Sequence, residues 1–343
     1  MGETGFIELL YDQSRIPVAR NQENVISVFL RNSHVLHSSL GWDYINDYRK
    51  YKEAMEKQYD SLILGYSTMY CDFKRAGEII ANNPNANLYF LTTDYTEQLP
   101  AALIYSKRPF ELIANFERQI KHVKILEEYC KKINRVNLNS LVLRNPNNEI
   151  PKKYDLIYYG QKREHRERYF REYFQGNYIH VSALKKNVKW FRNVGCDTKW
   201  VKRLKWNTGR ETLNLFKYSL YMEDENTHDN YSYLASRFYE CLTCNVVQFF
   251  DINCKNTIER SGIDFEDEFF VDGRKDLKNK VENSDFDRLL RLQKRLWLSK
   301  ALMEKKSVIE SVDCIIKGNA KKPTIEECHE KYKERIKGVK HDD

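Results

Sequence analysis

The sequence has 343 residues, enough for two domains of ordinary size, with 57 Lys and Arg against 49 Asp and Glu, a net charge of +8. Hydrophobic residues make up 41% of the chain and aromatic residues 13%, so it can bury sizeable cores, and extensive disorder is excluded. No apolar run approaches the ~20 residues of a membrane span. The first residues lack the basic-then-apolar order of a signal peptide. We therefore expect a soluble, cytoplasmic protein without a membrane partner. We take it to be a monomer, although the sequence itself does not determine the oligomeric state.

The first half of the chain alternates segments with strand and helix patterns. Short apolar runs predict strands at residues 24–30, 61–64, 88–91 and 138–143. Apolar residues at helical spacing predict helices at residues 42–58, 73–82 and 116–133, and a polar loop is expected at residues 31–41. Strands that alternate with helices imply parallel pairing and an α/β class.

A polar segment with two prolines, residues 145–151, is the best linker candidate near the middle of the chain. After it the alternation restarts. Strands are predicted at residues 155–159, 178–181, within 212–221, and at 246–250. Helices are predicted at residues 163–174 and 227–242, and from residue 285 a long helix is expected to cross back to the first half. The chain is therefore predicted to form two successive α/β domains.

The eight cysteines indicate free thiols, because no secretion signal accompanies them. Cys241 and Cys244 form the one close pair. No second pair or histidine pair follows at zinc-site spacing, so ordinary packed thiols are favoured over metal or redox use.

Positive charge is concentrated in residues 152–210, which hold 16 Lys and Arg against 5 Asp and Glu. Trp190, Trp200 and Trp206 are interleaved with these cations. The mixture suits a polyanion with stackable bases, since cations neutralise phosphates and rings stack on bases. The alternative is an ordinary solvated face whose aromatic rings turn into the core. The candidate DNA-contacting side chains are Lys185, Lys186, Lys189, Arg192, Lys199, Lys202 and Arg203.

The segment 218–251 has the order strand, loop, helix, strand, with Thr227 placed to cap the helix. Arg237 and Glu240 are three residues apart and are expected to project from one side of that helix. Such a pair could take a nucleotide diphosphate, because arginine forks to phosphate oxygens and glutamate accepts from ribose hydroxyls. The alternative is a surface ion pair within the helix.

A second candidate site follows the strand at residues 155–159. Gly160 stands between that strand and a helix, where a phosphate can approach backbone N–H groups. Arg163 and Arg166 fall in the first turns of the helix, where cations oppose the helix dipole and a bound anion would offset the cost. A turn glycine with solvated arginines is the alternative.

These motifs together resemble the donor half of GT-B glycosyltransferases. The resemblance rests on the strand-Gly-x-x-Arg at Gly160 and Arg163, the Arg-Phe-Tyr-Glu helix at residues 237–240, and the strand Val-Val-x-Phe-Phe-Asp at residues 246–251. More closely, they resemble phage enzymes that glycosylate hydroxymethylated pyrimidines in DNA, the T-even DNA β-glucosyltransferases and phage DNA arabinosyltransferases. The resemblance covers residues 155–251, and the first half matches only in its order of elements.

This resemblance implies two Rossmann-like domains with a cleft between them: an acceptor (DNA) domain at residues 1–148, a nucleotide-sugar domain at residues 149–284, and C-terminal helices at residues 285–343 that pack back on the first domain. It also implies a UDP-sugar donor, UDP-glucose or UDP-arabinose, and double-stranded DNA with hydroxymethylated bases, in a host cytoplasm if phage-encoded. Arg237 and Glu240 would hold the donor's diphosphate and ribose. Arg163, and less directly Arg166, would also contact the diphosphate.

A transferase of this type needs a carboxylate that takes the proton of the acceptor hydroxyl. Asp94 follows the strand at residues 88–91, where open α/β sheets bind ligands, although it could equally cap a turn. His34 and His37, in the expected loop, are alternatives. Glu223, Asp224 and His228 could touch the sugar or form a polar loop. A Mg²⁺ or Mn²⁺ ion that bridges the diphosphate through few protein ligands stays open.

Two competing functions stay open as well. The acceptor could be a glycan, a lipid head group or a small molecule. The chain could instead be a non-catalytic nucleic-acid-binding protein.

Overall fold

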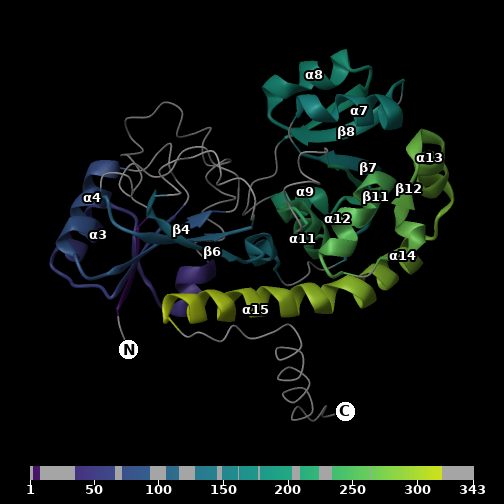
Figure 1. Ribbon diagram of the computed structural model, residues 1–343. Helices are drawn as coiled ribbons and strands as arrows, with labels where there is room; N and C mark the ends of the chain where they lie inside the picture. Colours follow the sequence, from purple (N-terminus) through teal and green to yellow (C-terminus); the bar gives the residue numbers. More distant parts are fainter. Residues whose placement is uncertain are drawn as a thin grey trace, which may run out of the picture. The chain divides into compact units, whose positions relative to one another are not determined.

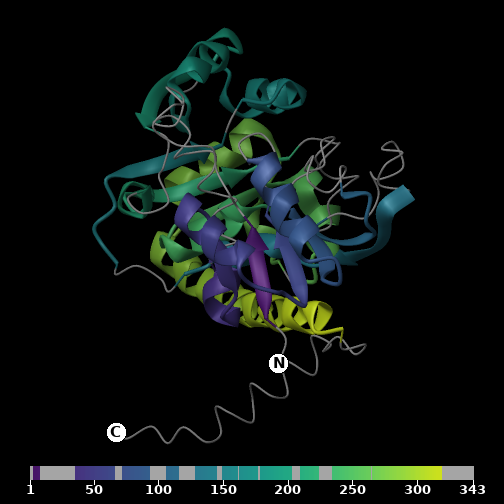
Figure 2. The ribbon, with the colours of Figure 1, turned by 90° about the vertical axis from the view of Figure 1, so that its left-hand side faces the viewer.

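The computed structural model of the chain (Figures 1 and 2) describes residues 3–7, 35–65, 72–92, 106–115, 128–144, 149–160, 162–176, 178–202, 209–223, 234–263 and 265–318. It divides into two compact units, Met1–Leu141 with Met303–Asp343, and Val142–Leu302. The domain boundaries expected after residues 148 and 284 stay predictions. No helix within the described ranges combines the length and the apolar character that a membrane crossing requires.

The first unit is built on a parallel six-stranded sheet with the strand order β2-β1-β3-β4-β5-β6. Figure 2 shows β1 as the purple strand. The strands of this sheet are β1 Thr4–Ile7, β2 Asp43–Ile45, β3 Ser61–Leu64, β4 Asn87–Thr92, β5 Phe110–Ala114 and β6 Cys130–Arg135. Every residue of β3 is buried, as expected for an inner strand of a parallel sheet whose two faces are covered by helices.

Aspartate side chains start both helices that precede strands β3 and β4. Asp47 accepts a hydrogen bond from the backbone N–H of Lys50 at the start of α3 (Tyr48–Met55). Asp72 does the same for Arg75 at the start of α4 (Phe73–Asn82). These caps satisfy N–H groups that the first helical turn leaves without partners.

The C-terminal helix α15 (Ser299–Ile316) packs on the first unit from Met303 onward. Its buried residues Val308, Val312 and Ile315 belong to the same hydrophobic cluster as Phe6 of β1. The hydroxyl of Tyr89 in β4 donates to the carbonyl of Ile315 at 3.3 Å. The helix predicted to cross back to the first half is therefore present, and Figure 1 shows it in yellow.

The second unit holds another parallel six-stranded sheet, with the strand order β12-β11-β10-β7-β8-β9. Its strands are β7 Tyr154–Tyr159, β8 Tyr178–Ala183, β9 Asp197–Lys202, β10 Phe216–Tyr221, β11 Val247–Asp251 and β12 Phe270–Val271. The helical elements are η3 Glu164–Arg166, α7 Glu167–Phe174, η4 Lys185–Asn187, α8 Val188–Asn193, α9 Gly209–Leu213, α11 Ser236–Thr243, η5 Ile252–Cys254, α12 Lys255–Arg260, η6 Asp267–Phe269, α13 Gly273–Asn283, α14 Phe286–Gln293 and η7 Lys294–Leu298. The α/β class and the double sheet agree with the prediction.

Three predicted elements of the first half are wrong in part. The helix expected at residues 42–58 is the strand β2 followed by the shorter helix α3. The helix expected at residues 116–133 lies outside the described residues up to 127, and its end overlaps the strand β6. The strand expected at residues 138–143 is the 3-10 helix η2 Leu138–Val142. The strand β6 has a polar sequence because it is the last strand of its sheet, where Lys131 and Lys132 reach solvent.

Two further expectations need correction, and one concerns residues that the structure does not describe. The first part of the helix expected at residues 227–242 lies outside the described residues; the described helix α11 begins at Ser236 with Ala235 as its N-cap, so Thr227 does not cap α11. His37 lies in a helical segment, not in a loop, and its ring stacks on Tyr44. The strand expected at residues 24–30 lies outside the described residues.

Candidate functional site

The second sheet changes direction of winding between two neighbouring strands. From β7 the chain continues to β8 and β9 on one side, and then returns to β10, β11 and β12 on the other. Beyond the carboxyl ends of two such strands, open α/β sheets bind ligands. Gly160 directly follows β7, and Met222 and Glu223 directly follow β10. The sequence candidates of the second half therefore gather at the switch point of this sheet.

The side chain of Tyr158, two residues earlier, approaches Gly160 closely. A Cβ atom at this position would lie 2.8 Å from the hydroxyl oxygen of Tyr158, which is closer than real Cβ contacts allow. The backbone N–H of Gly160 donates to the carbonyl of Ser182 in β8 at 3.2 Å. The glycine thus keeps space free above the hydroxyl of a buried tyrosine.

A buried arginine and a half-buried one meet a buried glutamate at this edge, and we call Arg166, Glu223 and Arg237 the arginine–glutamate cluster. Arg166 comes just before α7 and is 6% exposed, whereas Glu223 is 2% exposed. Nη2 of Arg166 donates to Oε2 of Glu223, and Nη2 of Arg237 donates to Oε1 of the same carboxylate. A single carboxylate therefore ties together two helical elements that flank the switch point.

Further contacts fix both guanidinium groups. Nη1 of Arg166 donates to the hydroxyl of Tyr158 at 3.3 Å, and Nη2 of Arg237 donates to the carbonyl of Met222 at 2.8 Å. The guanidinium of Arg237 also lies 4.5 Å from the ring centre of Tyr221. The Tyr221 hydroxyl in turn accepts a hydrogen bond of 2.9 Å from the backbone N–H of Ala235, the N-cap of α11.

The electrostatics of the cluster favour an added anion. Burial is the largest single influence on the pKa of Arg237 and would lower it, but the charge of Glu223, with smaller contributions from Tyr221 and Tyr158, raises that pKa on balance. Two guanidiniums and one carboxylate leave one positive charge in excess. Nε of Arg237 is buried and has no hydrogen-bond partner in the described part of the chain. A buried N–H without a partner is costly, and an oxyanion is the type of group that removes this cost.

The structure distinguishes between the predicted donor-site residues. Arg166 is buried in the cluster, whereas Arg163 is exposed. Arg237 pairs with Glu223, outside its own helix, so a surface ion pair within the helix does not describe it. Glu240 lies half-buried one turn after Arg237 on the same helix. Sequence reasoning left Glu223 as a sugar contact or a loop residue, although its place directly after the buried strand β10 was the available signal.

Several candidates lie outside the described residues: Asp94, His34, Asp224, Thr227, His228, Arg203 and Trp206. Asp94 comes two residues after Thr92, the last residue of β4. For Lys202 the structure describes the backbone alone.

The basic residues occupy two places. Lys185, Lys189 and Arg192 are exposed and follow one another at helical spacing along η4 and α8, and Lys186 is exposed beside them. η4 begins two residues after Ala183, the end of β8, at the same edge as Gly160. Lys199 pairs with His180 further back along the sheet, before the last pair of β8 and β9.

The described tryptophans of this segment are structural. Trp190 packs edge-on against Phe170 and Phe191, and its Nε1 donates to Glu164 at 3.0 Å. Nε1 of Trp200 donates to the carbonyl of Ala183 at 2.9 Å. Both rings are half-buried, so the alternative in which the aromatic rings turn toward the core is correct for this pair.

Not every cation of the basic segment faces solvent. Nζ of Lys152 donates to the backbone carbonyls of Asn214 and Asn245, each at 2.8 Å. It therefore ties the start of the second unit to the loops before β10 and β11, and it does not serve as a surface charge.

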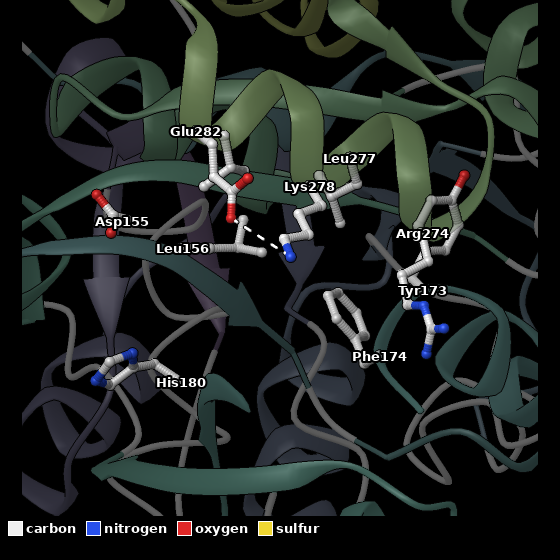
Figure 3. A pocket seen from close by; sticks show the side chains of 10 residues that line it. Asp155, Leu156, Tyr173, Phe174, His180, Arg274, Leu277, Lys278 and Glu282 are labelled. Atoms are coloured by element: carbon white, nitrogen blue, oxygen red, sulfur yellow. Dashed lines mark ion pairs between the residues drawn. The ribbon is translucent and has the colours of Figure 1, made fainter. Parts of the chain in front are cut away.

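A separate cavity of about 300 Å³ lies at the opposite end of β7 (Figure 3). Asp155 and Leu156, near the start of that strand, line it together with side chains of α7 and α13. Figure 3 shows the ion pair of Lys278 with Glu282, 3.8 Å long, at its rim. Burial and the charge of Lys199 lower the pKa of His180, which also lines the cavity. None of the predicted site residues lies in it.

Within the described ranges, no group of three or more His, Cys, Asp or Glu side chains is arranged to hold a metal ion. The cysteines described there, Cys241 and Cys244 included, are free thiols, as predicted. Burial raises the pKa of Cys241 and Cys254 and brings that of Cys196 to about 11.

The two sheets and the returning C-terminal helix make this a GT-B fold, as solved structures confirm. No protein-family model matches the sequence, and no curated protein sequence matches it significantly. A DNA-modifying β-glucosyltransferase, solved with and without uridine diphosphoglucose, superposes with a TM-score of 0.64 at 18% identity, over 92% of this chain and 99% of that chain.

Two further similar structures are of T4 phage β-glucosyltransferase. One, a study of substrate binding and the proposed catalytic mechanism, has a TM-score of 0.64 at 16% identity. The other, in complex with UDP and Mn²⁺, has a TM-score of 0.60 at 16% identity. Both cover 92% of this chain and 99% of the other. The resemblance of the motifs at residues 155–251 thus extends to the fold of nearly the whole chain.

Proposed function

We propose that the protein is a glycosyltransferase that moves glucose or arabinose from a UDP-sugar to the hydroxymethyl group of a 5-hydroxymethylpyrimidine in double-stranded DNA, with cytosine as the expected base. The observation that carries the proposal is the arginine–glutamate cluster. It has an excess positive charge and lies at the switch point of the second sheet, where such sheets bind ligands. The similar fold of a DNA-modifying β-glucosyltransferase supports the acceptor class.

The donor binds through its diphosphate in this proposal. Arg166 and Arg237 hold the phosphate oxygens, Gly160 lets the diphosphate approach the backbone, and Glu240 accepts from the ribose hydroxyls. Arg163, exposed before the same helix, contributes from solvent. As the bond between the sugar C1 and the diphosphate oxygen breaks, negative charge grows on the leaving UDP. Fixed guanidinium groups stabilise that charge without reorganisation.

The acceptor is activated by a carboxylate. Asp94 takes the proton of the hydroxymethyl oxygen while this oxygen forms its bond to the sugar C1, so the products are glycosylated DNA, UDP and a protonated carboxyl. The target base leaves the stack to become accessible. Should a Mg²⁺ or Mn²⁺ ion take part, no described cluster of three ligands would hold it, and no step above depends on one.

Exposed cations hold the DNA backbone in this proposal. Lys185, Lys186, Lys189 and Arg192 form a positive ridge on η4 and α8, and η4 starts at the edge that carries the donor site. Lys199 and Lys202 of β9, with Arg203 after them in the sequence, would add separate backbone contacts. Contacts of this kind carry affinity and not sequence information, so the hydroxymethyl group itself must provide specificity.

Mass spectrometry of DNA tests the function directly. Duplexes with 5-hydroxymethylcytosine, 5-hydroxymethyluracil or unmodified pyrimidines are incubated with UDP-glucose or UDP-arabinose. We expect the mass of one sugar to appear on hydroxymethylated DNA alone, and Asp94→Asn to abolish transfer while UDP still binds. UDP binding without transfer to any duplex would point to a glycan or small-molecule acceptor. No UDP binding at all would leave a nucleic-acid-binding protein.

A further inference from the structure

We propose that Glu223 is a positioning residue for the donor diphosphate, which sets the spacing of Arg166 and Arg237 on either side of the switch point. The inference deepens the proposed function and rests on it. Glu223 would touch neither the sugar nor the phosphates, because it is 2% exposed and its two carboxylate oxygens already face the two guanidinium groups.

The two arginines come from separate elements and share this carboxylate as a support. Arg166 comes before α7, after strand β7, whereas Arg237 lies in the first turn of α11, after strand β10. Each is also held on its own side, Arg166 by the hydroxyl of Tyr158 and Arg237 by the carbonyl of Met222. Because Glu223 bonds both guanidinium groups, it couples the position of one to that of the other.

The charge of Glu223 also has to be explained, because a carboxylate beside a diphosphate site repels the ligand. Without it, two largely desolvated guanidiniums would face each other with no counter-ion, and like charges at close range repel each other. With it, Arg237 turns Nη2 to the carboxylate and keeps Nε without a partner among the described residues. The carboxylate therefore weakens the attraction of the site for the diphosphate, but it holds the two arginines at a fixed separation.

A fixed separation matters for two linked phosphates and much less for one. A diphosphate can engage both guanidiniums at once only when their distance matches that of its oxygens. A monophosphate needs one of them. Glu223 should accordingly set the preference for UDP over UMP, and this preference separates positioning from a general role in stability, which would weaken both ligands equally.

The test measures the dissociation constants of UDP and UMP by calorimetry on the full chain. In Glu223→Gln the amide keeps the shape but accepts at one oxygen only, so UDP should bind about 10-fold or more weakly while UMP changes less than about 3-fold. Glu223→Asp keeps the charge on a shorter side chain and should recover part of the preference. Glu268→Gln removes a carboxylate that pairs with Arg288 in the same unit and should leave both constants unchanged.

The outcomes separate this inference from the proposed function. Parallel losses for UDP and UMP in Glu223→Gln, or no loss, overturn the positioning role. If Glu223→Gln does not fold, Glu223→Asp decides by the same ratio, and an unchanged preference for UDP overturns the inference. A wild-type chain that binds no UDP overturns both. If the wild type binds UDP, Arg237→Ala abolishes this binding and Glu223→Gln leaves it unchanged, then the positioning role of Glu223 is overturned and the proposed function stands.

Discussion

At the scale of single residues, the environment of an arginine decides its role more than its place in a motif. Arg163 and Arg166 are equivalent in the sequence, three residues apart before one helix. The structure buries Arg166 against Glu223 and Tyr158 and leaves Arg163 exposed. Desolvated arginines bind phosphate more strongly than hydrated ones, because the surrounding protein screens the charge less.

This difference gives a prediction for the two arginines. Arg166→Ala should weaken UDP binding about 10-fold or more, the usual size for a charge-assisted hydrogen bond in a desolvated site. Arg163→Ala should weaken it by less than about 3-fold, as expected for an exposed charge. Calorimetric titration of both variants with UDP checks the order. A larger loss for Arg163→Ala would show that the exposed arginine carries the diphosphate.

A buried aspartate gives a second prediction at this scale, on stability. Asp251 ends β11 fully buried, with Oδ1 bonded to the backbone of Asn253 at 2.7 Å and Oδ2 without a partner among the described residues. Burial raises its pKa, although the bonds from Asn253 oppose the shift. The folded state thus holds this proton at a pH where the unfolded chain has released it, and stability falls as pH rises from the unfolded pKa through the folded one.

Asp251→Asn removes this ionisation. The melting temperature of the variant relative to wild type should therefore increase as the pH is raised from about 4 to about 8, because only the wild type has to bury a charge or retain a proton. Thermal unfolding followed by circular dichroism measures it. Asp267→Asn, at an exposed position, is the matched control. A constant difference across this pH range would contradict the prediction.

At the scale of elements, the sequence shows inner strands well and edge strands poorly. Strands such as β3 and β11 are buried along their whole length. Because both faces of such a strand are covered, its sequence is a mostly apolar run. The edge strand β6 (CKKINR) needs no such run, and its buried Asn134 is paired with Glu111 of β5 at 2.7 Å. Its strand character comes from pairing with β5, a tertiary contact that no local pattern contains.

The helices show the same limit at the site. The periodicity of the segment before β11 predicted a helix that starts at Thr227, and the described helix α11 starts at Ser236. At the start of α11, the hydroxyl of Tyr221 accepts a hydrogen bond from the backbone N–H of Ala235, the N-cap residue, 14 residues later in the chain. The pair Arg237 and Glu240 could be proposed from its spacing, whereas the contact of Arg237 with Glu223 could not, because Glu223 lies outside the helix, directly after β10.

The elements η4 and α8 carry a prediction about DNA. The triple variant Lys185→Gln, Lys186→Gln, Lys189→Gln should weaken duplex binding and lower the slope of log K against log salt by about 2 to 3, roughly one for each phosphate that is no longer neutralised. Fluorescence anisotropy at several salt concentrations measures the slope. Lys278→Gln, an exposed lysine on α13, should leave it unchanged. An unaltered slope in the triple variant would place the DNA elsewhere.

At the scale of the whole molecule, the order of elements was enough to predict the class, because strands alternating with helices typically form parallel sheets covered by helices. The order of the strands could not be predicted in the same way, because the chain returns to the middle of the second sheet with β10, which pairs with β7. That return creates the switch point and brings Glu223 to Arg166, 57 residues earlier. The site is thus a product of topology.

The same division into two units predicts how a ligand changes the unfolding of the whole chain. Trp190, Trp200 and Trp297 lie in the second unit, and Trp42 lies in the first. A ligand that binds only the folded second unit stabilises it by about 2.7 kcal/mol at a concentration 100 times its dissociation constant. UDP should therefore raise the midpoint of thermal unfolding monitored by tryptophan fluorescence, and Arg237→Ala should remove this shift. Because most of the described tryptophans report on the second unit, a midpoint that does not move with UDP would mean that the ligand does not bind this unit, and the arginine–glutamate cluster would lose its assigned role.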